Sequence, residues 1–303
     1  MTDSNGDSYL PKGINRVWTL PDLELRALWD SIILDDTRKT QLVSQAVINF
    51  TVRTKVSRSV LPLHGVILLV GPPGTGKTSL ARGLAHRVAE SFTGATFRLL
   101  EVEPHSLTSS AMGKTQRAVS DLFAQSIAES AANGPTIVLL DEVETLAADR
   151  SKLSLEANPI DIHRATDAVL VQLDLLADKN PNLLFIATSN FPEAVDSAFT
   201  SRCDLIMEIP LPDRDACKRI LQDCLAGLGS TFPDIAKLSA SSQFDHCADE
   251  CVGLDGRAIR KVVANALAAS PKTAINPNEV SIDDLIGAAK YAKSNRAAGG
   301  KIK

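Results

Sequence analysis

One short segment constrains the possible folds of this chain more than any other. An apolar run at residues 66–70 leads into it, and residues 79–90 after it have a helical pattern. The segment fits the pattern G-x-x-x-x-G-K-[ST] in the strand and helix context that this pattern requires. We predict that it forms, with Ser79 at the start of the helix, a loop that binds the phosphates of a nucleoside triphosphate. Its residues are Gly71, Pro72, Pro73, Gly74, Thr75, Gly76, Lys77 and Thr78.

The expected chemistry of this P-loop follows from its residue types. Glycines let backbone N–H groups close around a polyphosphate, and the start of the next helix adds a partial positive charge. We expect Lys77 to reach the β- and γ-phosphate oxygens and Thr78 to ligate Mg²⁺. A glycine-rich structural turn is the alternative interpretation, and the flanking strand and helix argue against it.

Two carboxylates end a second predicted strand. Residues 136–140 are almost entirely apolar, as in a strand buried in a parallel sheet, and Asp141 and Glu142 follow them. Ligands in such sheets bind at the carboxyl ends of the strands. We therefore expect Asp141 to hold magnesium and Glu142 to orient and deprotonate the attacking water. A solvated acidic strand end is the alternative.

Further candidate residues lie before and after these motifs. Asn190 follows the apolar strand at residues 183–188 and is placed to bond the water and the γ-phosphate, although turn propensity alone would also explain it. Arg257 lies in the first turn of a helix, where the helix dipole disfavours a cation. A bound phosphate would explain this position, and a surface accident is the alternative. Upstream of the P-loop, Ile32 or Ile33 either contacts the adenine or belongs to the core.

The chain length and a pair of prolines predict two unequal domains. A chain of 303 residues with 44% hydrophobic content can bury two cores, and the prolines at 210 and 212 mark a boundary. We predict an α/β fold with a parallel sheet and helices on both faces, followed by a small α-helical domain. The predicted segments are a disordered N-terminus at 1–15, an α/β domain with an N-terminal arm at 16–211, a helical domain at 212–292 and a disordered tail at 293–303.

Composition excludes several classes of partner. A count of 32 basic against 36 acidic residues gives a net charge of −4, which does not favour nucleic acid or an anionic membrane. The polar, acidic start and the lack of a membrane-length apolar run lead us to expect a soluble, cytoplasmic protein. The five cysteines are an odd number, so we expect buried free thiols in preference to a disulfide framework or a zinc site.

Together, these motifs resemble an AAA+ ATPase with a helical lid, and more closely the pachytene-checkpoint family, whose members remodel HORMA-domain proteins. The likeness extends over residues 18–292. The stretches that carry it are Leu-Trp-Asp-Ser at 28–31, His-Ser-Leu at 105–107, Asp-Glu-Val-Glu at 141–144, Gln-Leu-Asp at 172–174, Thr-Ser-Asn at 188–190 and Gly-Leu-Asp-Gly-Arg at 253–257.

The resemblance implies a role for each candidate residue. Lys77 and Thr78 would bind ATP phosphate and Mg²⁺, and Asp141 and Glu142 would be the Walker B pair. It further implies sensor one at Asn190, sensor two at Arg257 and a finger at Arg202 that acts on a neighbouring subunit. The family forms hexameric rings that thread a terminal segment of the client through a central pore.

Two departures from the family pattern matter. The chain begins almost at the ATPase core, and in this it resembles short bacterial members encoded beside HORMA proteins and nucleotide-second-messenger synthases in antiphage systems. The pore-loop pattern of aromatic, apolar residue and glycine is Ala111, Met112 and Gly113 here, without the aromatic. Grip on a client would then depend on Met112 or on another loop, such as residues 149–161.

Three functions are compatible with this pattern. They are an ATP-driven remodeller of a protein partner, a nucleotide-dependent switch without turnover, and an ATPase that acts on DNA as a loader or helicase accessory. The switch would be expected to lack Glu142 or Arg202, and both are present. A DNA-directed protein would be expected to carry a basic face, which the composition does not supply. We therefore favour the remodeller, with a client that the sequence does not identify.

Overall fold

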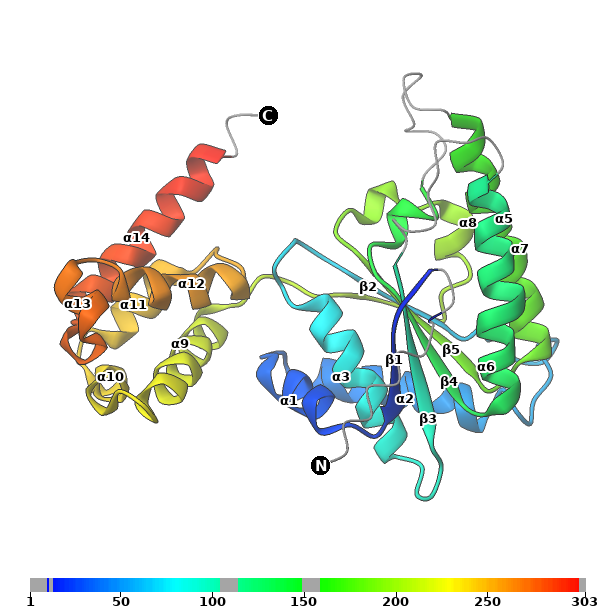
Figure 1. Ribbon diagram of the computed structural model, residues 1–303, viewed down its shortest axis with the longest axis horizontal. Coiled ribbons are helices and arrows are strands. Elements are labelled where there is room, and N and C mark those ends of the chain that lie inside the picture. The colour runs from blue at the N-terminus through cyan, green and yellow to red at the C-terminus, as the bar shows by residue number, and fades with distance from the viewer. Residues whose placement is uncertain (1–9, 11–12, 104–113, 149–158, 300–303) are drawn as a thin grey trace, which may run out of the picture. The chain divides into compact units, whose positions relative to one another are not determined.

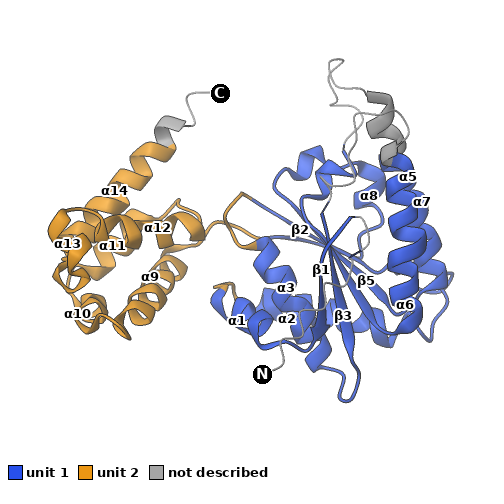
Figure 2. Ribbon diagram, in the orientation of Figure 1, with its two compact units in different colours: residues 1–31, 36–71, 77–208 blue, residues 32–35, 72–76, 209–303 orange. Residues whose placement is uncertain are grey.

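The computed structural model describes residues 10, 13–103, 114–148 and 159–299 (Figure 1). The chain divides into two compact units, which are described separately (Figure 2). The α/β unit comprises Met1–Ser31, Asp36–Gly71 and Lys77–Glu208. The helical unit comprises Ile32–Asp35, Pro72–Gly76 and Ile209–Lys303. Its main segment thus begins at Ile209, whereas the sequence analysis placed the domain boundary after residue 211.

A six-stranded sheet forms the centre of the α/β unit. The strand order is β1-β3-β4-β5-β2-β6, and all neighbours are parallel except β1 and β3. The inner strands β2, β4 and β5 are buried along their whole length, which explains their nearly continuous apolar sequences. The strands are β1 Ile14–Leu20, β2 Val66–Val70, β3 Phe97–Val102, β4 Thr136–Leu140, β5 Leu183–Ser189 and β6 Leu205–Glu208.

The antiparallel edge strand β1 corrects the expectation of disorder through residue 15. Ile14 and residue 15 already belong to β1, which pairs with β3. Trp18 Nε1 donates a hydrogen bond of 2.7 Å to Glu101 Oε1 on β3, and both side chains are buried. This tertiary contact spans 83 positions in the sequence, so the local polarity of the N-terminus gave no sign of it.

Helices cover both faces of the sheet, with α1, α2 and α3 on one face and α5, α6 and α7 on the other (Figure 1). A π-helical turn at Leu122–Ile127 joins α5 to α6 within the segment expected to be one helix. The helices are α1 Leu23–Ser31, α2 Asp36–Thr51, α3 Lys77–Glu90, α5 Lys114–Asp121, α6 Ala128–Asn133, α7 Pro159–Lys179 and α8 Ser197–Thr200.

The helical unit packs around its own apolar core. Cys217, Cys247 and Cys251 are buried in this core, and burial raises the pKa of the Cys217 thiol to about 11. Asp213 caps the first long helix, since its side chain accepts a hydrogen bond of 2.8 Å from Ala216 N. The helices are α9 Arg214–Gly229, α10 Pro233–Lys237, α11 Phe244–Cys251, α12 Gly256–Leu267, α13 Pro271–Ile275 and α14 Ile282–Gly299.

The last helix corrects the prediction of a disordered tail from residue 293. Residues 293–299 continue α14 to Gly299. Arg296 Nη1 donates a hydrogen bond of 2.7 Å to Gly253 O and lies 3.6 Å from Asp255 Oδ2. These contacts hold the end of the helix to the rest of the unit, and the sequence pattern did not indicate them. Within the described residues, no helix has both the length and the apolar character needed to cross a membrane.

Candidate active site

The candidate site begins where three neighbouring strands end. Strand β5 lies between β4 and β2, so their carboxyl ends are adjacent. Gly71 follows β2, Asp141 follows β4 and Asn190 follows β5. Parallel strands place such residues at one edge of the sheet, where ligands of α/β folds bind. The chain thus brings the predicted phosphate and magnesium ligands of the α/β unit to one place.

Lys77 is the buried cation of this edge. Only 5% of its surface is exposed, and its Nζ donates a hydrogen bond of 2.8 Å to Gly71 O. Burial lowers the pKa of Lys77, while the carboxylates of Glu144, Asp141 and Glu142 act in the opposite direction. A buried ammonium close to several carboxylates is suited to binding a polyanion that arrives with a divalent cation.

Asp141 receives two hydroxyl groups on one carboxylate oxygen. Thr78 Oγ1 donates to Asp141 Oδ1 at 2.8 Å, and Thr188 Oγ1 donates to the same oxygen at 2.5 Å. The hydroxyl of Thr78 and the carboxylate of Asp141 are the hard oxygen ligands that magnesium prefers. This donor set therefore fits a magnesium ion. The contribution of Thr188 was not predicted, because a threonine inside a buried strand has no sequence signature of its own.

Glu142 has an unusual backbone conformation for a residue with a side chain. Its φ of 52° lies in the left-handed region. Its N–H donates to Thr188 Oγ1 at 3.1 Å, and its Oε1 accepts from Asn190 Nδ2 at 3.0 Å. A cavity of about 130 Å³ borders Asp141 and Glu142 and has room for water. Backbone strain of this kind is found at functional sites. We refer to Thr78, Asp141, Glu142, Thr188 and Asn190 as the carboxylate cluster.

Glu144 extends the carboxylate cluster and was given no role from the sequence. Its Oε1 accepts a hydrogen bond of 3.1 Å from Asn190 N. Its Oε2 is buried and has no hydrogen-bond partner among the described residues. It is also the strongest opposite charge acting on Lys77. Its presence in the stretch Asp-Glu-Val-Glu at 141–144 was the only signal in the sequence.

The middle of the P-loop, Pro72–Gly76, belongs to the helical unit. Gly74 has φ of 82°, and a Cβ at this position would lie 2.2 Å from Asp255 Oδ1. Gly76 has φ of 90°, and a Cβ there would lie 2.5 Å from Ile32 Cδ1. The positive φ therefore favours glycine at both positions, and the approach of Asp255 adds a steric reason at Gly74. Gly74 O also accepts a hydrogen bond of 3.3 Å from Arg257 N.

Three predicted site residues of the helical unit have contacts that leave their roles as predictions. Ile32 approaches Gly76, whereas Ile33 packs against the core of the helical unit. Arg257 follows the N-cap Asp255 of α12, and its side chain is exposed. The predicted pore-loop residues Ala111, Met112 and Gly113 lie outside the described residues, as does most of the alternative loop at 149–161.

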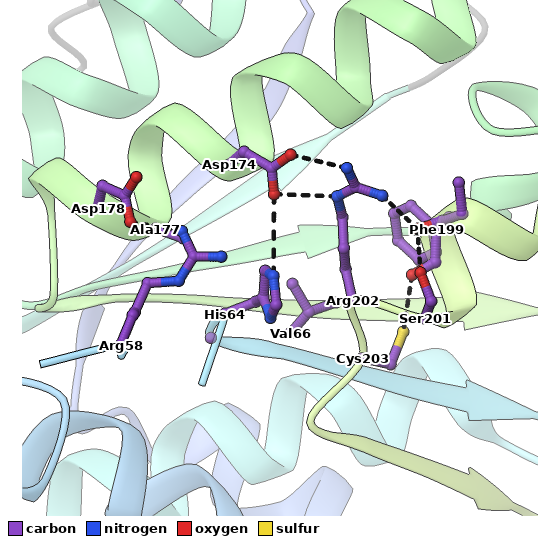
Figure 3. A network of polar contacts seen from close by, with 12 residues as sticks. Arg58, His64, Val66, Asp174, Ala177, Asp178, Phe199, Ser201, Arg202 and Cys203 are labelled. Atoms are coloured by element: carbon purple, nitrogen blue, oxygen red, sulfur yellow. Dashed lines mark hydrogen bonds and ion pairs between the residues drawn. The ribbon is translucent and has the colours of Figure 1, made fainter. Parts of the chain in front are cut away.

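Arg202 lies directly after α8 in a separate polar network (Figure 3). Its guanidinium makes hydrogen bonds to both carboxylate oxygens of Asp174, at 3.0 and 2.7 Å. Hydrogen bonding to Asp174 raises the pKa of Arg202, and the same contact lowers the pKa of Asp174. The sequence singled out Arg202, but its partner Asp174 was noted only as part of a family resemblance.

The comparisons with known proteins agree with this geometry. Residues 67–211 match the model of the ATPase family associated with various cellular activities (AAA). The P-loop, the carboxylate cluster and this match define the class of the protein as an AAA ATPase, and nucleotide binding follows from that class.

Two curated relatives narrow the class. The chain is 75% identical to CD-NTase-associated protein 6 of Pseudomonas aeruginosa over 99% of its own length and 98% of that protein. It is 32% identical to the pachytene checkpoint protein 2 homolog of Danio rerio over 83% of the chain and 65% of that protein. The chain belongs to the pachytene-checkpoint family of AAA ATPases.

A solved structure has the same fold. One chain in the structure of the E. coli MS115-1 HORMA:CdnC:Trip13 complex superposes on this chain with a TM-score of 0.73. The match covers 91% of this chain and 94% of the matched chain. The two sequences are 18% identical, so this likeness establishes the fold alone.

Proposed function

We propose that this chain hydrolyses ATP in a magnesium-dependent reaction and uses the energy to remodel a protein partner. The partner is a HORMA-domain protein of a bacterial antiphage signalling system, in complex with a nucleotide-second-messenger synthase. The working form is a homo-hexameric ring in the cytoplasm. The proposal combines the chemistry of the carboxylate cluster with the names of the related proteins.

The observation that carries the ATPase reaction is the hydrogen bond between Glu142 and Asn190 beside the pair Thr78 and Asp141. Thr78 and Asp141 would hold the magnesium ion, which neutralises phosphate charge when bound. Glu142 accepts the proton of the attacking water, and Asn190 fixes the carboxylate that does so. Lys77 binds the β- and γ-phosphate oxygens, because its ammonium is buried at the same sheet edge.

Glu144 supports the position of Asn190. It accepts the backbone N–H of Asn190 through Oε1, so it fixes the turn that presents the Asn190 amide. Its charge also opposes the loss of the Lys77 proton on burial. We assign Arg202 as the finger that acts on the nucleotide of a neighbouring subunit, and Arg257 as sensor two of its own subunit.

The protein partner is proposed from the relatives. A protein that shares 75% identity with this chain along almost its whole length is named for its association with a CD-NTase. The fold relative from E. coli MS115-1 is part of a complex with HORMA and CdnC. A chain so similar to the first protein is expected to act in the same kind of system. The loop Ala111, Met112 and Gly113 is proposed to contact the threaded client.

A trapping experiment tests the proposed partner. A tagged Glu142→Gln protein is incubated with ATP and Mg²⁺ in lysate of its native host, and the captured proteins are identified by mass spectrometry. We expect a HORMA-domain protein in this sample and its absence with Lys77→Ala, which should not bind ATP. Capture of a replication protein or DNA in place of a HORMA-domain protein would overturn the partner and leave the ATPase chemistry intact.

A further inference from the structure

The guanidinium of Arg202 is fixed by two different elements of its own subunit (Figure 3). Nε donates to Asp174 Oδ1 at 3.0 Å, and Nη2 donates to Asp174 Oδ2 at 2.7 Å. Nη1 donates to Ala198 O at 2.7 Å. Asp174 lies on α7 and Ala198 on α8, so the planar group is held on two sides. Such a fork geometry leaves little freedom for rotation of the side chain.

Part of the hydrogen-bonding capacity of Arg202 remains after these contacts. An arginine has five N–H donors, and three of them are bonded to described residues. Each terminal nitrogen, Nη1 and Nη2, keeps one further N–H group. The side chain is 23% exposed, so part of Arg202 remains accessible to solvent. Two N–H groups at the end of a guanidinium match the geometry of a phosphate.

A histidine lies beside the Asp174 carboxylate, beyond hydrogen-bond distance. His64 Nε2 lies 3.8 Å from Asp174 Oδ1, in the segment that precedes β2. The His64 backbone is fixed in turn, because its N–H donates to Asp204 Oδ1 at 2.8 Å. One turn further along α7, Asp178 pairs with Arg58 (Figure 3). The side chain of Asp174 is 39% exposed, so water screens the attraction between the two charges, whereas the two parallel hydrogen bonds still fix the orientation of the guanidinium.

We propose that Asp174 is a positioning residue for Arg202, which it holds with two N–H groups presented to a phosphate bound by a neighbouring subunit. The inference rests on the proposed role of Arg202 as a finger. A long arginine side chain loses much rotamer freedom when it binds a phosphate, and the pairing with Asp174 removes that freedom in advance. The contact with the neighbour's phosphate strengthens as charge develops in the transition state. Loss of Asp174 should accordingly lower kcat and leave nucleotide affinity unchanged.

The test measures kcat, KM and the affinity for a fluorescent ATP analogue in the assembled protein. We expect Asp174→Asn to lower kcat by about 10- to 100-fold, the cost of a displaced catalytic group, with the analogue affinity unchanged. The matched control is Asp178→Asn, which removes the neighbouring carboxylate on α7 and should have wild-type kcat. In the double variant Asp174→Asn with Arg202→Ala, kcat should equal that of Arg202→Ala alone, because Asp174 acts through Arg202.

A second variant covers the case in which Asp174→Asn does not fold. Arg202→Lys keeps the positive charge but cannot pair with both oxygens of Asp174, so its kcat should approach that of Arg202→Ala. Wild-type kcat in Arg202→Lys would show that the reaction does not require the pairing of a guanidinium with both oxygens of Asp174, and would overturn the inference.

Other results would overturn the inference in distinct ways. Wild-type kcat in a folded Asp174→Asn protein, beside an impaired Arg202→Ala, would remove Asp174 from the reaction. A higher kcat in Asp174→Asn would mean that the contact withholds Arg202. Additive losses in the double variant would mean that Asp174 acts independently. Wild-type kcat in Arg202→Ala would instead refute the finger assignment in the proposed function.

Discussion

The carboxylate cluster and the network around Arg202 are two polar regions of the same α/β unit that differ in charge balance. In the first, Asp141, Glu142 and Glu144 gather around Lys77, and Glu144 Oε2 has no hydrogen-bond partner among the described residues. In the second, Arg202 is matched by Asp174. Excess carboxylate charge suits a region that receives a cation with its ligand. A matched pair suits a region that fixes the position of a side chain. We therefore assign the chemical reaction to the carboxylate cluster and the positioning of Arg202 to the second region.

The largest expected effect comes from removing the base of the carboxylate cluster. Glu142→Gln should lower kcat by about 10²- to 10⁴-fold, because the amide cannot accept the proton of the attacking water. ATP binding should persist, since Lys77 and the P-loop are unchanged. Steady-state ATPase assays and binding of a fluorescent ATP analogue measure both quantities. Glu129→Gln, an exposed change on α6, is the matched control. Turnover at the wild-type rate in Glu142→Gln would mean that another residue is the base and that the carboxylate cluster does not carry the chemistry.

A smaller effect is expected from Thr188, which bonds the Asp141 carboxylate and the Glu142 backbone N–H. Thr188→Val keeps the shape of the side chain but leaves the Glu142 N–H without its acceptor and Asp141 Oδ1 with only one of its two donors, Thr78. We expect the free energy of unfolding to fall by about 1–3 kcal/mol, the cost of unsatisfied buried groups. Urea denaturation measures it, with Thr51→Val on α2 as the control. Equal midpoints for Thr188→Val and the wild type would show that the cluster does not depend on this hydroxyl.

The smallest effect concerns His64 in the network around Arg202. Burial and the charge of Arg58 lower the pKa of His64, while Asp204 and Asp174 act in the opposite direction. The folded state therefore binds fewer protons here than the unfolded state, whose histidine pKa is about 6.5. The stabilising contribution of neutral His64 is present above that pKa and is lost as the pH falls through it toward the lowered folded value. His64→Gln should flatten this part of the pH profile of denaturation midpoints. Identical pH profiles of the denaturation midpoint in the wild type and His64→Gln would contradict the assignment of this pH dependence to His64.

The two regions also differ in how far the sequence predicts them. The P-loop and the pair Asp141 and Glu142 follow strands in continuous motifs, so short-range patterns locate them. Asp174 and Arg202 are 28 positions apart, and only the folded structure, in which Arg202 bonds residues of both α7 and α8, reveals their contact. Thr188 and Glu144 were missed for the same reason, since their partners come from other segments.

The fold follows a similar division. The buried strands were predictable from apolar runs, and the parallel sheet with a helical unit after it agrees with the structure. The edge strand β1 and the end of α14 were not, because both depend on distant partners. Trp18 bonds to Glu101, and Arg296 bonds to Gly253. Local polarity therefore predicted disorder where tertiary contacts produce order.

The central claim is that each ATP site combines the carboxylate cluster of one subunit with Arg202 of another. Lys77→Ala lacks a working P-loop, and Arg202→Ala lacks the finger, so each protein alone should hydrolyse ATP poorly. In mixed rings, some interfaces join an intact P-loop to an intact Arg202, and ATPase activity should exceed the sum of the two separate proteins. Native mass spectrometry would verify that mixed rings form. Mixed rings with no gain in activity would contradict the account.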